Sequence, residues 1–167
     1  MGGSISVNSA KGKGSTFTVQ LTLPYAEELA EKDSTTAEQN LHGLHLLLAE
    51  DNPLNQELCL ELLKSRGISS DCAVNGKEAL ELFTNSAPGT YALILMDIQM
   101  PVMDGYEATA AIRALPRQDA VRIPILALTA NAFVTDVGKA KNAGMNDHIT
   151  KPINLEVLFA TLYKWLV

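Results

Sequence analysis

The feature that most constrains this chain is the alternation of short apolar runs with longer amphipathic stretches between residues 43 and 167. An uninterrupted apolar run of this kind suits a strand buried on both faces, and such strands occur in parallel sheets covered by helices. The pattern therefore predicts a doubly wound (βα)5 domain of the α/β class. The predicted strands cover residues 44–49, 71–74, 92–96, 123–128 and 148–150.

Residues typical of helix starts and helix ends lie between these strands. The first predicted helix, over residues 53–66, repeats leucine at helical spacing, has Asn52 as its N-cap and Pro53 at its first position, and ends before Gly67. We expect four further helices, over residues 77–84, 106–115, 131–142 and 155–166.

The first 42 residues have a different character. Residues 1–24 carry two lysines and no acid, and their apolar side chains alternate from Thr16 to Leu23, which predicts a β-hairpin with Gly12 and Gly14 in its turn. Because an isolated hairpin is marginal in water, we expect it to be disordered or paired with a partner. Residues 25–42 carry five acids against one lysine, which is typical of an acidic linker.

Charge and hydropathy narrow the range of partners. The chain has 13 Lys and Arg residues against 19 Asp and Glu, a net charge of −6, so we expect no direct contact with nucleic acid. No apolar run approaches the roughly 20 residues that span a bilayer, and no secretory leader is evident. We expect a cytoplasmic chain without direct membrane contact, whose two cysteines are free thiols.

Polar residues follow the predicted strands on one side of the sheet. Glu50 and Asp51 follow the first strand, Asp97 the third, Thr129 the fourth and Lys151 the fifth. Since the carboxyl ends of parallel strands share one edge, these side chains should meet there. Carboxylates brought together repel each other unless a cation lies between them. Oxygen ligands with open positions favour Mg²⁺, with Mn²⁺ as the other candidate.

Four segments resemble the receiver domain of two-component response regulators: LLLAEDNPLNQ, ILMDIQMPVMDGYE, ILALTANA and HITKPI. The resemblance covers essentially all of residues 43–167. It implies a flavodoxin-like sheet with strand order 2-1-3-4-5. It also implies that Asp97 accepts a phosphoryl group from a phosphohistidine, and that Lys151 pairs with the phosphoryl oxygens.

The same resemblance implies further roles. Glu50, Asp51, Asp97 and the backbone carbonyl of Gln99 would hold Mg²⁺, and Pro152 would follow a cis peptide bond. Gln99 and Asn131 would tune the lifetime of the phosphorylated state. Thr129 and His148 would form the conformational switch, although the family more often has Tyr or Phe at the position of His148.

Residues 1–24 resemble the carboxyl end of the ATP-binding domain of sensor histidine kinases, on the strength of GGSI, GKGS and FTVQLTLP. The order of kinase tail, linker and receiver domain over residues 43–167 implies the C-terminal part of a hybrid histidine kinase, which could itself be anchored in a membrane. We expect no ATP site in this chain, so its own chemistry would be limited to phosphoryl transfer. Its partners would be a phosphohistidine domain of a kinase and a histidine phosphotransfer domain.

Two other functions are compatible with this fold. One is an interaction module that is never phosphorylated, which the complete set of polar residues at the strand ends disfavours. The other is a phosphatase of the haloacid dehalogenase type, which also uses an aspartyl nucleophile after a strand. That family requires a second Asp two residues later, where this chain has Gln99.

Overall fold

The computed structural model describes residues 3–10, 12–21, 41–130 and 134–167, which fall into two units. The smaller unit is the predicted hairpin, and its two strands pair with each other. Strands β1 (Gly3–Ala10) and β2 (Gly14–Leu21) are antiparallel, with Ile5 opposite Val19 and Val7 opposite Phe17. These four side chains are exposed, so one face of the hairpin is apolar.

The larger unit contains a five-stranded parallel sheet. Its strands lie in the order β4-β3-β5-β6-β7, which confirms the predicted order 2-1-3-4-5. The strands are β3 (His45–Ala49), β4 (Ser69–Ala73), β5 (Leu93–Asp97), β6 (Ile125–Thr129) and β7 (Asp147–Thr150).

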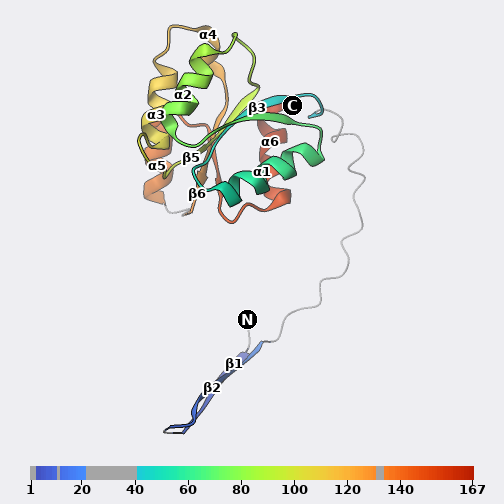
Figure 1. Cartoon of the computed structure of the whole chain (residues 1–167), viewed down its shortest axis with the longest axis vertical. Helices are drawn as coiled ribbons and strands as arrows, with labels where there is room; N and C mark the ends of the chain where they lie inside the picture. The colour runs from blue at the N-terminus through green and yellow to red at the C-terminus, as the bar shows by residue number, and fades with distance from the viewer. Residues whose placement is uncertain (1–2, 11, 22–40, 131–133) are drawn as a thin grey trace. The chain divides into compact units, whose positions relative to one another are not determined.

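Helices cover both faces of this sheet, α1 and α6 on one side and α2, α3 and α5 on the other (Figure 1). Alternate residues of β3 show the division: Leu46 and Leu48 belong to the first core, and Leu47 and Ala49 to the second. None of the described helices is long and apolar enough to cross a membrane. The helices are α1 (Pro53–Ser65), α2 (Gly76–Asn85), α3 (Gly105–Arg113), α4 (Gln118–Arg122), α5 (Val134–Ala143) and α6 (Leu155–Leu166).

Among the differences from the predicted elements, three have a clear physical reason. Helix α4 was not predicted, because five residues are too few to show helical periodicity. Strand β4 begins at Ser69 instead of residue 71, since an edge strand with alternating exposure lacks a continuous apolar run. Leu41, assigned to the linker, is fully buried in the core beneath α1 and α6. The predicted helix start at residues 131–133 lies outside the described residues.

Two glycines, the first residues of α3 and α2, lie so close to the backbone at β5 and the loop that follows it that a side chain would not fit. A Cβ on Gly105 would lie 2.2 Å from the carbonyl oxygen of Asp97, and a Cβ on Gly76 would lie 2.6 Å from that of Met103. Backbone hydrogen bonds from Gly105 to Ile98 and from Gly76 to Met103 fasten the same loop. Helices α2 and α3 therefore hold this loop directly beside Asp97.

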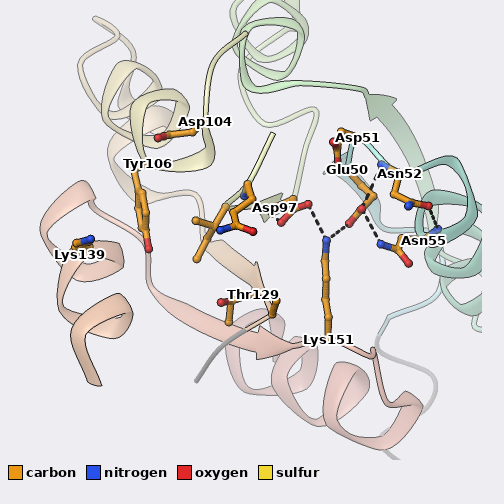
Figure 2. A pocket seen from close by; sticks show the side chains of 13 residues that line it. Glu50, Asp51, Asn52, Asn55, Asp97, Asp104, Tyr106, Thr129, Lys139 and Lys151 are labelled. Carbon is orange, nitrogen blue, oxygen red and sulfur yellow. Dashed lines mark hydrogen bonds and ion pairs between the residues drawn. The ribbon is translucent and has the colours of Figure 1, made fainter. Parts of the chain in front are cut away.

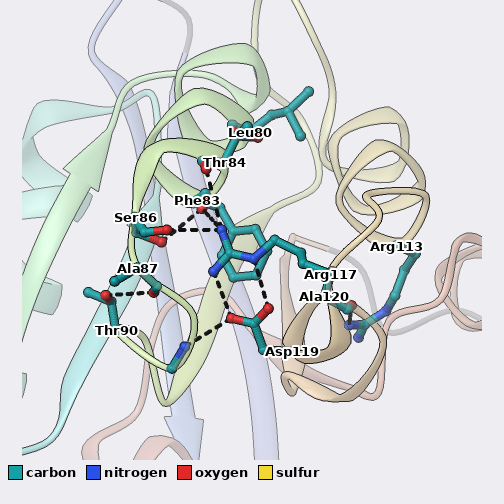
Figure 3. Close-up of polar contacts among 11 residues, drawn as sticks. Leu80, Phe83, Thr84, Ser86, Ala87, Thr90, Arg113, Arg117, Asp119 and Ala120 are labelled. Atoms are coloured by element: carbon teal, nitrogen blue, oxygen red, sulfur yellow. Dashed lines mark hydrogen bonds and ion pairs between the residues drawn. The ribbon is translucent and has the colours of Figure 1, made fainter.

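Arg117 joins the end of α2 to the segment before α4 (Figure 3). Its guanidinium donates to the carbonyl oxygens of Phe83 and Ser86, which satisfies acceptors at the end of the helix. It also stacks 4.3 Å from the centroid of the Phe83 ring and binds both carboxylate oxygens of Asp119 at 2.7 Å. The planar fork of arginine is needed for this combination of contacts.

We expect Arg117→Lys to lower the free energy of unfolding by about 2 kcal/mol, because lysine cannot bind bidentately and stack at once. Urea titration at neutral pH measures the change, with Arg122→Lys on the exposed side of α4 as the control. Arg117 also holds the pKa of Asp119 well below its usual value of 3.8. The stabilising contribution of this depressed pKa is present above the usual value and is lost as the pH falls through the folded-state pKa. The difference in stability between the wild-type protein and Arg117→Lys should therefore shrink in acid. Equal stability of the two proteins at pH 7 would contradict the stabilising role of Arg117.

Candidate functional site

A cavity of about 480 Å³ lies at the carboxyl edge of the sheet. Figure 2 shows side chains from several strand ends pointing into it. The five residues predicted to meet at this edge all line the cavity: Glu50, Asp51, Asp97, Thr129 and Lys151. Asp97 and Thr129 are the last residues of β5 and β6, so the sheet itself positions them.

The ammonium group of Lys151 lies between two buried acids. Its Nζ is 2.6 Å from Oε2 of Glu50 and 2.7 Å from Oδ2 of Asp97. The other oxygen of Asp97, Oδ1, accepts from the backbone N–H of Gln99 at 3.3 Å. Both partners of the lysine are almost fully buried, so solvent screens these ion pairs little.

Burial and ion pairing act in opposite directions on the two central groups. Burial raises the pKa of the Asp97 carboxyl, and the hydrogen bond from Lys151 opposes the rise without cancelling it. Burial lowers the pKa of Lys151, but its hydrogen bonds to Asp97 and Glu50 outweigh that effect and raise the pKa. Lys151 is therefore a cation at neutral pH, and its charge favours the ionised form of Asp97.

The three acids form a cluster suited to a hard cation. Oxygen atoms of Glu50, Asp51 and Asp97 all lie within 4.8 Å of one another. Three carboxylates against one nearby lysine leave an excess of negative charge, and every side-chain donor in the cluster is oxygen. This set fits Mg²⁺ or Mn²⁺, which prefer oxygen ligands, and does not resemble a zinc site with nitrogen and sulfur ligands.

The remaining predicted residues are placed as follows. Gln99 lines the same cavity, and the Lys151–Pro152 peptide bond is cis, as expected. His148 is half-buried and lines a different cavity, together with Met145 and Asp147, so the structure does not bring it to the acidic cluster. Asn131 lies outside the described residues.

The lining residues that were not predicted as part of the site include Asn55, Asp104, Tyr106 and Lys139. They belong to helices or helix caps, whereas the pattern of apolar runs reveals only residues at strand ends. Asn55 carried one usable signal, since it lies in the first turn of the helix that follows Glu50 and Asp51. Its side-chain amide donates to Oε1 of Glu50 at 3.0 Å.

Comparison with known protein families agrees with this geometry. Residues 46–163 match the response regulator receiver domain family. The chain belongs to this family. The aerobic respiration control sensor protein ArcB of Escherichia coli is 39% identical over 166 residues, which is 99% of this chain and 21% of ArcB. Hybrid signal transduction histidine kinase I of Dictyostelium discoideum is 43% identical over 119 residues, 70% of this chain and 7% of that protein. This receiver chain thus spans about a fifth or less of these curated relatives.

Solved receiver domains share the fold. The receiver domain of the sensor histidine kinase PA1611 from Pseudomonas aeruginosa is 40% identical, with a TM-score of 0.67 over 74% of this chain and 98% of that one. It was crystallised with a magnesium ion coordinated in its active-site cleft. The receiver domain of Saccharomyces cerevisiae Ssk1, crystallised with the histidine phosphotransfer protein Ypd1, is 34% identical, with a TM-score of 0.65 over 74% of this chain and 88% of that one.

Proposed function

We propose that this receiver domain accepts a phosphoryl group on Asp97 from a phosphohistidine and passes it on to a histidine phosphotransfer domain. The observation that carries the proposal is the buried Asp97 carboxylate, joined to Lys151 at 2.7 Å within a cluster of three acids. Such a cluster is costly to assemble for structural purposes alone, because like charges repel. A phosphoryl group brings oxygens that the lysine can bind.

The transfer requires little from the protein beyond positioning and charge. A carboxylate oxygen of Asp97 attacks phosphorus, a P–O bond forms as the P–N bond of phosphohistidine breaks, and the imidazole nitrogen leaves with the bonding electrons. Lys151 lies where its ammonium can move from Asp97 to a phosphoryl oxygen. Thr129, at the end of the neighbouring strand, lines the same cavity and can donate to another.

Mg²⁺ would be held by Glu50, Asp51 and Asp97, with Gln99 beside them. When bound, it offsets the repulsion between these carboxylates and neutralises charge on the phosphoryl oxygens. The PA1611 receiver domain, crystallised with magnesium in its cleft, supports this assignment. Mn²⁺ has the same ligand preference and would serve in its place.

Incubation with acetyl phosphate tests the proposal. With Mg²⁺ present, the intact protein should gain the mass of one phosphoryl group, in a form that alkali removes, and chelation of the metal should prevent the gain. No gain in mass with Mg²⁺ and excess acetyl phosphate would contradict the proposed function. It would also favour an interaction module that is never phosphorylated.

We also propose that residues 1–24 are the last strands of a kinase ATP-binding domain and that residues 25–40 form a linker, which ends before Leu41 because that residue belongs to the receiver core. Two observations support this assignment. The match to ArcB extends over 99% of this chain and so includes the hairpin. The hairpin also exposes apolar side chains on one face, Ile5 and Val7 on β1 and Phe17 and Val19 on β2, as expected of strands that belong to a larger sheet.

The first helix offers a docking surface for the phosphotransfer partner. Leu54 and Leu58 lie one turn apart on α1 and are 74% and 46% exposed, next to the cavity-lining residues Asn52 and Asn55. Exposed apolar side chains beside a reaction centre suit contact with an apolar helix face. The Ypd1 complex of the Ssk1 receiver domain supports a partner of this class.

We expect Leu54→Ser to slow phosphoryl transfer between this domain and phosphorylated Ypd1 about ten-fold, through a higher KM, because a contact worth about 1.4 kcal/mol is lost. Labelling by acetyl phosphate should not change, because that small donor needs no docking surface. Val121→Ser, at a site 68% exposed on α4, is the control. Equal rates for the two variants would place the docking surface elsewhere.

A further inference from the structure

The carboxylate of Glu50 is held from two sides (Figure 2). Its side chain is fully buried, and Oε2 pairs with Lys151 at 2.6 Å. Oε1 accepts from the side-chain amide of Asn55 at 3.0 Å and lies 3.4 Å from the backbone nitrogen of Asn52. The shorter of the two contacts to Oε1 therefore comes from Asn55, a residue to which the receiver chemistry proposed above gives no role.

The first turn of α1 places Asn55 at this position. Asn52 caps α1 by accepting from the backbone N–H groups of Leu54 and Asn55, and Pro53 fixes the first helical residue. Asn55 thus lies in a rigid first turn, immediately after the strand end that carries Glu50. From there its side-chain amide reaches back across the turn and donates to the Glu50 carboxylate.

Glutamate needs such a partner more than aspartate would. It has one more methylene group and one more side-chain torsion, and the final torsion to the carboxylate is broad. Without Asn55, the Glu50 carboxylate could rotate about that torsion while keeping its contact with Lys151. Its orientation toward Asp51 and Asp97 would then no longer be fixed.

We propose that Asn55 is a positioning residue for the cation site and acts through Glu50. The inference rests on the proposed function, because it assumes that Glu50, Asp51 and Asp97 bind Mg²⁺. Hydrogen-bond partners of metal ligands typically contribute 10-fold to 100-fold to metal affinity. Asn55→Ala should therefore weaken Mg²⁺ binding by about ten-fold, toward the lower end of that range.

Calorimetric titration of the full chain with Mg²⁺ alone, with no phosphodonor, measures this effect directly. Gln56→Ala is the matched control, since Gln56 occupies the same turn and its backbone N–H bonds to the carbonyl oxygen of Asn52. Circular dichroism without metal shows whether each variant is folded. If Asn55→Ala does not fold, Asn55→Ser replaces it, because serine tolerates the first turn of a helix but is too short to reach Glu50.

A second background tests whether the effect passes through Glu50. The shorter side chain of Glu50→Asp cannot maintain the contact with Asn55, so adding Asn55→Ala to it should cause no further loss of affinity. A ten-fold loss in both backgrounds, or wild-type affinity in Asn55→Ala, would overturn the role of Asn55. If the wild-type chain itself bound no Mg²⁺, the proposed function would fail, and this inference with it.

Discussion

Replacing Asp97 with asparagine should abolish phosphorylation by acetyl phosphate. Asparagine has nearly the same shape, but its amide is a poor nucleophile and cannot form the acyl phosphate. Asp97 is the last residue of a fully buried strand, and its carboxylate contacts Lys151 at 2.7 Å, so its position in the site is fixed. The gain in mass seen with the wild-type protein should disappear completely.

Asp104→Asn is the matched control for this loss. Asp104 lines the same cavity and caps α3, and asparagine caps a helix about as well as aspartate. This variant should be labelled as fully as the wild-type protein. Labelling of Asp97→Asn would show that a different residue accepts the phosphoryl group.

Replacing Lys151 with methionine should lower the free energy of unfolding by about 3 kcal/mol in the absence of divalent cations. The change keeps most of the apolar stem but leaves Glu50 and Asp97 buried without their cation, and breaking a buried pair in this way costs about 3–5 kcal/mol. The lysine side chain is only 19% exposed, so water cannot take over its role fully. Mg²⁺ should restore part of the loss, because a cation that binds only the folded state stabilises that state.

Urea titration with chelator and then with Mg²⁺ measures both effects. Lys164→Met is the control: Lys164 also contacts a carboxylate at 2.6 Å, that of Asp147, but its side chain is 63% exposed. An exposed pair of this kind is worth at most about 1 kcal/mol. Equal losses in the two variants would show that the acidic cluster does not depend on Lys151 for its stability.

The sheet and the polar residues at its carboxyl edge could be predicted from the sequence because both follow from local patterns. Apolar runs identify buried parallel strands, and polar residues immediately after them must then share one edge, which placed Glu50, Asp97 and Lys151 together. Asn55 and Tyr106 could not be predicted in this way, because which side chains of a helix face a site depends on how the helix packs. Leu41 was missed for a related reason: a single leucine in a polar segment has no periodicity that would reveal its burial.

The location of His148 shows a different limit of prediction from the sequence. His148 lies in β7, the strand that ends just before Lys151, as predicted, yet its ring lines a cavity other than that of the acidic cluster. Successive residues of a strand point to opposite faces, so proximity in sequence does not bring side chains together. A role for His148 in switching remains a prediction.

The two close-approach glycines have a mechanical consequence. Gly105 lets α3 pack against the backbone of Asp97, and Gly76 lets α2 pack against the backbone of Met103. Backbone hydrogen bonds from the two glycines to Ile98 and Met103 join the same segments. This flank of Asp97 is therefore closely packed: a side chain at Gly105 would clash with the backbone of Asp97, and one at Gly76 with the backbone of Met103. We expect the two sides of Asp97 to differ in how far their backbone can move. Displacement on phosphorylation should spread mainly through the opposite flank, where Thr129 ends β6 and Lys151 follows β7.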